Sequence, residues 1–82
     1  MIYTFSVTDP DGIINYPLDF LWKNKDNQIG VGMLDFSWTT NIKLARTWPE
    51  QDMVETIAIE FNNTEIIEIN ENGEYKVIKT ME

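Results

Sequence analysis

Apolar and polar residues alternate in the first stretch of the chain, from Ile2 to Thr8. Tyr3, Phe5 and Val7 fall on one face of an extended chain, and hydroxyl-bearing residues occupy most of the other. A period of two is typical of a half-buried β-strand. Residues 9–12, with the sequence Asp-Pro-Asp-Gly, come next. Proline presets φ for a type I turn and glycine accepts the left-handed conformation, so the pattern predicts a hairpin.

Two further apolar stretches occupy the middle of the chain, at residues 13–22 and 29–38. Pro17 interrupts the first stretch. Because proline cannot donate a ladder hydrogen bond, we expect this strand to lie at a sheet edge or to break there. Gly30 and Gly32 lie in the second stretch, where they predict a bend, a bulge or the close approach of another backbone.

The C-terminal stretch predicts a second hairpin around a three-residue loop, Glu71-Asn72-Gly73. With Gly73 in the left-handed conformation, this register gives two opposite-charge pairs and three apolar pairs across the strands. A two-residue Asn-Gly loop would set Glu71 against Glu74, so charge matching selects the three-residue loop. The predicted pairs are Ile69 with Tyr75, Glu68 with Lys76, Ile67 with Val77, Ile66 with Ile78, and Glu65 with Lys79.

Residues 47–61 fit two kinds of structure. Residues 47–50, Thr-Trp-Pro-Glu, have the form of a helix capping box and precede a helical stripe of apolar residues. The β-branched run at residues 56–59 instead favours a strand. Such a strand would join the C-terminal hairpin through a loop at residues 62–64, pairing Ile57 with Ile69 and Ile59 with Ile67. The helical stripe consists of Met53, Val54, Ile57, Ala58 and Phe61.

These patterns together predict a single domain over residues 1–82 that is mainly antiparallel β, a meander forming a small rolled sheet or barrel. We expect at most one short helix, near residues 48–54, followed by a strand. The alternative is an α+β fold with a helix at residues 48–61 packed on the sheet.

The net charge of the chain limits the classes of partner that we expect it to bind. Its 82 residues include 14 acidic and 6 basic ones, for a net charge of −8. Binding nucleic acid requires lysine and arginine to neutralise phosphates, and an anionic membrane surface makes the same demand, so neither is an expected partner. The first residues contain neither a basic leader nor a long apolar run. We therefore expect a cytoplasmic protein.

The chain also lacks the residues on which most catalytic and metal sites depend. It contains no cysteine and no histidine, which removes thiol nucleophiles, thiolate metal sites and the most frequent acid-base group. Ser6 and Ser37 lie within predicted strands without a base nearby in sequence. Residues 9–12 lack the later ligands of a calcium loop. We expect no catalysis, no cofactor and no metal.

The distribution of acidic residues is the most informative feature for function. No basic residue occurs between Thr47 and Tyr75, so this part of the chain carries a negative field. Acids two residues apart on a strand lie about 6.8 Å apart on one face, a row comparable in kind to a nucleic-acid backbone. Trp48 beside these acids is a candidate interface anchor, with packing over the helix start as the alternative. The acids are Glu50, Asp52, Glu55, Glu60, Glu65, Glu68, Glu71 and Glu74.

Our first functional hypothesis is a small acidic binding protein that blocks a basic partner, such as a nuclease or another nucleic-acid-handling enzyme. Phage-encoded inhibitors of host defence and immunity proteins against nuclease toxins fit this description by analogy. The partner-binding residues would be Trp48 and the eight carboxylates. The alternative is a structural subunit that forms a homo-oligomer or completes a larger complex.

Overall fold

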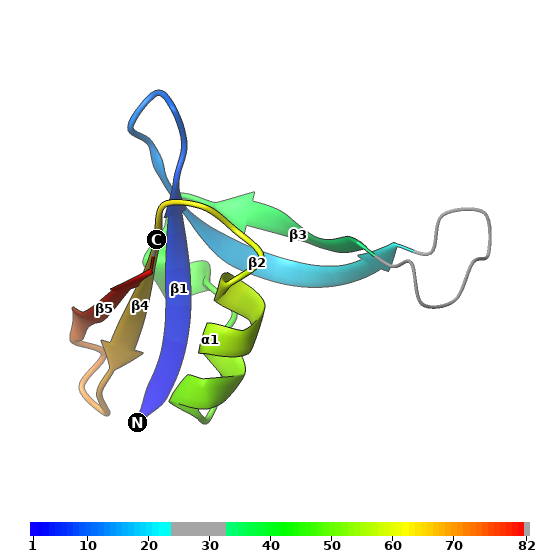
Figure 1. The fold of residues 1–82 in the computed structure, drawn as a ribbon. Coiled ribbons are helices and arrows are strands. Elements are labelled where there is room, and N and C mark those ends of the chain that lie inside the picture. The colour runs from blue at the N-terminus through cyan, green and yellow to red at the C-terminus, as the bar shows by residue number, and fades with distance from the viewer. Residues whose placement is uncertain (24–32, 82) are drawn as a thin grey trace.

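The computed structural model describes residues 1–23 and 33–81, with only the backbone for residues 19–23 and 33–36. Within these residues the fold is a five-stranded antiparallel sheet of order β3-β2-β1-β4-β5, with one α-helix packed on one face (Figure 1). The mainly antiparallel β prediction is therefore confirmed. The elements are β1 (Ile2–Thr8), β2 (Ile14–Lys23), β3 (Met33–Thr39), a 3-10 turn (Ile42–Leu44), α1 (Gln51–Ala58), β4 (Thr64–Ile69) and β5 (Tyr75–Met81).

Strand β1 is the centre of the sheet. It pairs with β4 from Ile2 to Val7 but with β2 only at Val7 and Thr8. Beyond those two pairs β2 leaves β1 and pairs with β3, so the β2–β3 ribbon extends away from the body of the sheet (Figure 1). The edge of β1 that β2 leaves is hydrogen-bonded instead to the segment before α1. There Tyr3 and Trp48 exchange two backbone hydrogen bonds of 2.8 Å.

The core lies between α1 and the sheet. Phe5, Val54, Ala58 and Ile66 are fully buried there, and Trp48 is nearly so. The Phe5 ring is within 6 Å, centroid to centroid, of several aromatic rings, including that of Trp48 at 5.9 Å. Aromatic burial of this kind provides most of the apolar contact in a domain of this size.

The opposite face of β1 is covered as well, which the sequence pattern did not indicate. Thr4 and Ser6 are on that face and are 0% and 1% exposed. The chain between β3 and α1 passes behind β1 (Figure 1), and the hydroxyl of Thr4 donates a 2.7 Å hydrogen bond to the carbonyl of Arg46. The prediction that β1 is half-buried therefore understates its burial.

The β4–β5 hairpin confirms the predicted loop and its first three pairs. Gly73 has φ of 82°, in the left-handed region, and the register beside the loop is the predicted one. The two pairs farthest from the loop are wrong, because a bulge at Ile78 shifts the register so that Ile66 pairs with Lys79 and Glu65 with Thr80. The bulge lets Ile78 pack against the core.

Residues 51–58 form helix α1, so the expected strand over residues 57–61 is wrong and the helical alternative is correct in kind. The meander that pairs Ile57 and Ile59 with β4 does not form, because β1 occupies that side of β4. The capping box is also wrong. Glu50 is the N-cap residue, without a side-chain capping bond, and the helix starts later than Trp48. Burial of Val54 and Ala58 against the sheet outweighs the β propensity of the run.

Pro17 lies where β2 has left β1, as expected for a residue that cannot donate to a ladder. Its carbonyl accepts a 2.7 Å hydrogen bond from the Arg46 amide, and the β2–β3 register shifts just after it. The prediction at Gly30 and Gly32 lies outside the described residues. Among those that are described, no helix is long and apolar enough to cross a membrane.

Candidate functional site

Two acidic segments flank the beginning of β1. On one side, Ile2 pairs with Ile69, which brings the β4–β5 turn next to the N-terminus. On the other side, the bonds between Tyr3 and Trp48 bring the start of α1 to the same end of the sheet (Figure 1). The two segments carry four exposed carboxylates, which we call the acidic end: Glu50, Asp52, Glu71 and Glu74.

The acidic end carries its charge unneutralised. Within the described residues, none of its four carboxylates forms an ion pair. Asp52 lies in the first turn of α1 and Glu50 occupies its N-cap position, where the positive end of the helix dipole favours a carboxylate. Glu71 and Glu74 have no such local role, because backbone groups and Asn70 alone hold the turn.

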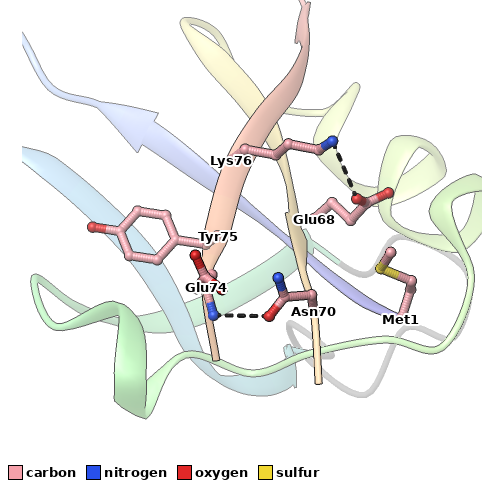
Figure 2. Close-up of a pocket in the computed structure, with 6 residues that line it drawn as sticks. All are labelled: Met1, Glu68, Asn70, Glu74, Tyr75 and Lys76. Atoms are coloured by element: carbon pink, nitrogen blue, oxygen red, sulfur yellow. Dashed lines mark hydrogen bonds and ion pairs between the residues drawn. The ribbon is translucent and has the colours of Figure 1, made fainter. Parts of the chain in front are cut away.

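A shallow depression of about 250 Å³ lies beside the β4–β5 turn (Figure 2). Its lining combines apolar and charged groups. Tyr75 projects to one side of β5 and Lys76 to the other, toward Glu68. The Tyr75 side chain is 56% exposed, so an aromatic surface borders the acidic end. The lining residues are Met1, Glu68, Asn70, Glu74, Tyr75 and Lys76.

Lysines of β5 engage two of the remaining carboxylates. Lys79 forms a hydrogen-bonded ion pair with Glu55 of α1, and Lys76 lies 3.8 Å from Glu68 of β4. The hydrogen bond from Lys79 is the main reason that the pKa of Glu55 is lowered. Glu55 and Glu68 therefore take part in holding β5 against its neighbours.

The eight predicted acids do not form one row. Glu65 and Glu68 lie on opposite faces of the sheet, because Glu65 pairs with Ser6 and Glu68 pairs with Tyr3 on alternate faces of β1. Glu60 follows α1, in the segment that leads to Asn63, whose carbonyl accepts a hydrogen bond from the amide of Thr8 at the end of β1. The expectation of a continuous row along a strand is wrong, because Glu65 and Glu68 are three positions apart and successive residues of a strand face opposite sides.

Trp48 is 7% exposed and packs in the core beside Phe5. The guanidinium of Arg46 lies 5.6 Å from its ring centroid. Trp48 therefore takes the alternative role, packing beside the helix start, and it does not offer an exposed anchor. Its backbone bonds to Tyr3 still give it a positioning role, since they bring the start of α1 to the acidic end.

A second cavity, of about 370 Å³ and more open to solvent than the depression beside the β4–β5 turn, lies at the other end of the sheet. Its walls are the half-buried side chains of Val7, Trp38 and Phe61, and Asp9 and Asn15 supply its polar atoms. The sequence did not predict this site, because its residues come together only through the pairing of β2 with β3 and the path of the chain after α1. The recurrence of an Asp or Asn three residues before glycine, at 9 and at 70, is the signal that marks its turn.

Acidic groups and two serine hydroxyls are the candidates for metal binding and nucleophilic chemistry among the described residues. No group of three or more acidic side chains among them is placed to hold a metal ion. Ser6 Oγ is buried and has no hydrogen-bond partner in the described part of the chain, and Ser37 is exposed on β3. Neither hydroxyl has a hydrogen bond that would activate it as a nucleophile.

Comparison with protein families, with curated proteins and with solved structures finds no match for this chain.

Proposed function

We propose that this protein is a small acidic binding protein that docks its acidic end on a basic partner and blocks it. The observation that carries the proposal is the gathering of four exposed, unpaired carboxylates on two segments that flank the start of β1. A chain with net charge −8 attracts a basic surface over a long range, so association is fast and sensitive to salt.

The surroundings of the acidic end suit a protein interface. Tyr75 and Ile2, which are 56% and 41% exposed, provide apolar area next to the carboxylates. Interfaces combine such an apolar centre, rich in tyrosine, with a polar rim. Hydrogen bonds to Asn70 hold the backbone of the turn that carries Glu71 and Glu74, so this backbone loses little conformational entropy when the two carboxylates meet a partner.

The partner class follows from the charge. A nuclease or another nucleic-acid-handling enzyme presents lysine and arginine where phosphates bind, and a cluster of carboxylates competes for those groups. Blocking that surface needs no catalysis, cofactor or metal from this chain. The proposal places the encounter in the cytoplasm and includes defence inhibitors of phage and immunity proteins as classes of the same kind.

The proposal is tested by capture on the tagged full chain. Lysate of the source cell or its host is passed over the protein, washed at low salt and eluted at high salt, and the eluate is identified by mass spectrometry. The captured protein is then assayed for nucleic-acid cleavage or binding with and without added chain. We expect a basic nucleic-acid enzyme that elutes with salt and loses activity when the chain is added.

Paired variants locate the contact. Glu71→Gln with Glu74→Gln removes two charges from the acidic end, and Asp11→Asn with Glu60→Gln removes two exposed charges from the other end. We expect the first pair to weaken binding about tenfold and the second to change it by less than about twofold. Equal effects of the two pairs would contradict docking through the acidic end.

A second candidate function is that of an assembly subunit, and the free edge of the sheet favours it. Strand β5 ends the sheet on one side, and Val77 beside Tyr75 is 49% exposed. The bulge at Ile78 and the two lysines of β5 oppose simple edge-to-edge pairing. Sedimentation at low and high salt separates the two candidate functions. An oligomer held by apolar area persists at high salt and would favour the assembly subunit, whereas a monomer at both salt concentrations would contradict it.

A further inference from the structure

The cavity at the far end of the sheet is lined by one charged group, Asp9, and by aromatic and polar side chains. Trp38 and Phe61 stand edge to face, with ring centroids 5.4 Å apart and planes at 88°. Phe5 contacts both rings from the core, at 6.0 and 5.7 Å. Their positions are therefore fixed by packing. Asp9 brings a carboxylate to this aromatic wall from the turn that joins β1 to β2.

The Asp9 carboxylate is held in place by its own turn. Its Oδ1 accepts hydrogen bonds from the amides of Asp11, at 3.0 Å, and Ile13, at 2.9 Å. Its Oδ2 has a single contact within the described residues, 3.5 Å from Asn15 Nδ2. One oxygen thus builds the turn while the other retains capacity to accept hydrogen bonds.

The turn between β4 and β5 shows that this geometry does not require a charge. There Asn70 Oδ1 accepts from the amides of Asn72, at 2.9 Å, and Glu74, at 3.1 Å, in the same two positions. The backbone bonds that close the two turns also correspond, at 2.9 to 3.0 Å. Asparagine therefore does the structural work of Asp9, and the negative charge of Asp9 is available for another purpose.

Aromatic faces and a fixed carboxylate together select a cation with an apolar stem. Aromatic rings attract a cation, and a guanidinium also stacks on them. Phe61 stacks against Phe5 on one side, so a ligand meets the parts of the Trp38 and Phe61 rings that line the cavity. Val7 offers apolar surface for an aliphatic stem. The cavity is open to solvent and its volume of about 370 Å³ leaves room for one side chain.

We propose that this cavity binds an arginine side chain, with the guanidinium between the Asp9 carboxylate and the rings of Trp38 and Phe61. That the arginine belongs to a basic protein partner rests on the proposed function. The binding of arginine itself does not, because Val7, Asp9 and Asn15 of the cavity lie where β1 meets β2, at the opposite end of β1 from the acidic end.

The test uses the full ¹⁵N-labelled chain and N-acetyl-arginine methylamide as the probe. At constant ionic strength we expect saturable shifts of the Trp38 indole N–H and the Asn15 side-chain amide, with a Kd in roughly the millimolar range. The neutral isostere N-acetyl-citrulline methylamide should bind about fivefold more weakly, as expected for loss of one ion pair. Equal binding of the two probes, or no saturable shift, would overturn the proposal.

Matched variants assign the charge. Asp9→Asn keeps the turn, as Asn70 does in its own turn, and should abolish the preference for arginine over citrulline. Asp11→Asn removes a charge two residues away that does not line the cavity, and should leave the preference within about twofold. Retention of the preference in Asp9→Asn contradicts the role of Asp9. If arginine binds but no basic partner is captured, the site stands and the blocking function falls.

Discussion

The two hairpins of this protein have the same turn but different strands. Each turn has Asp or Asn at its first position and a glycine three residues later, with φ of 83° at Gly12 and 82° at Gly73. The β4–β5 strands then stay paired along their length. The β1–β2 strands separate after two residue pairs, at Val7 with Asn15 and Thr8 with Ile14.

The difference shows that a turn determines the local reversal of the chain but not the partner of each strand. Away from the turn, β1 pairs with β4, and Phe5 pairs with Ile66 in the core. Strand β2 instead contains Pro17, which cannot donate a hydrogen bond to extend the ladder with β1. From there β2 pairs with β3. Packing with residues distant in sequence decides the continuation in both hairpins.

Replacing each turn glycine by alanine should have the largest effect and should be the same in both hairpins. A Cβ at Gly12 or Gly73 would meet no atom within 4 Å, so the cost is that of the left-handed backbone alone. We expect each variant to lose about 1–2 kcal/mol in free energy of unfolding, measured in urea. Asparagine at either position should be less costly. A clearly larger loss at one turn would show that the two turns are not equivalent.

Removing the side chain that closes each turn should have a smaller effect, again equal in the two hairpins. Asp9→Ala and Asn70→Ala each leave two amide groups without their acceptor. Because these amides are exposed and water replaces the acceptor, we expect each variant to lose about 1 kcal/mol. Asp9→Asn should stay within about 0.5 kcal/mol of the natural chain. Thermal unfolding at constant pH measures all three, and a loss confined to Asp9→Ala would contradict the equivalence.

Local patterns predicted the parts of the fold that depend on neighbouring residues. The first strand, both turns and the register beside Gly73 follow from alternation, turn chemistry and charge matching. The helix at residues 51–58 was harder to predict, because the β propensity of its last residues competes with a helical stripe. The contact of Val54 and Ala58 with Phe5 and Ile66 decides that competition, and no local pattern contains it.

The candidate sites were predicted less well than the fold. The acids at 50, 52, 71 and 74 were identified by composition, but only the pairing of β1 with both flanking segments places them at one end. Trp48 is a sequence candidate because it lies beside these acids, but in the fold it is buried next to its bridge with Tyr3. The cavity at Asp9 draws on five segments of the chain, so its residues share no sequence pattern.

Acid should weaken the attachment of the β4–β5 hairpin to α1. The pKa of Glu55 is lowered below its ordinary value of 4.5, mainly by its hydrogen bond with Lys79. The unfolded chain therefore binds the proton more readily, and this contribution to stability is complete above pH 4.5 and lost as the pH falls through the lowered pKa. Lys79→Met should flatten the dependence of unfolding free energy on pH in that range.

Lys76→Met is the control for that measurement. Lys76 is 71% exposed and lies 3.8 Å from Glu68, a looser pair than that of Lys79 with Glu55. We expect its pH dependence to stay close to that of the natural chain. If both variants flatten the curve equally, general charge balance rather than the Glu55 pair governs acid stability.

Alkali should loosen the contact between the two hairpins, with the smallest effect of the four. The pKa of Tyr16 on β2 is raised above 10.0, first by burial and then by the charges of Tyr75 on β5 and Glu65 on β4. Stability that depends on neutral Tyr16 is complete below pH 10.0 and is lost as the pH rises through the raised pKa. Ultraviolet absorbance of phenolate follows the ionisation, and Tyr16→Phe assigns it among the tyrosines.

Glu65→Gln separates the causes of this shift. The variant removes one nearby charge but leaves the burial of Tyr16 unchanged, so the Tyr16 pKa should fall part of the way toward its ordinary value. Tyr75→Phe should also lower the Tyr16 pKa part of the way, because it removes the other nearby charge. Burial, the largest cause of the shift, is unaltered in both variants. A complete return to the ordinary pKa in Glu65→Gln would mean that charge, rather than packing between the hairpins, keeps Tyr16 neutral. The two hairpins would then be joined by weaker contacts than their burial indicates.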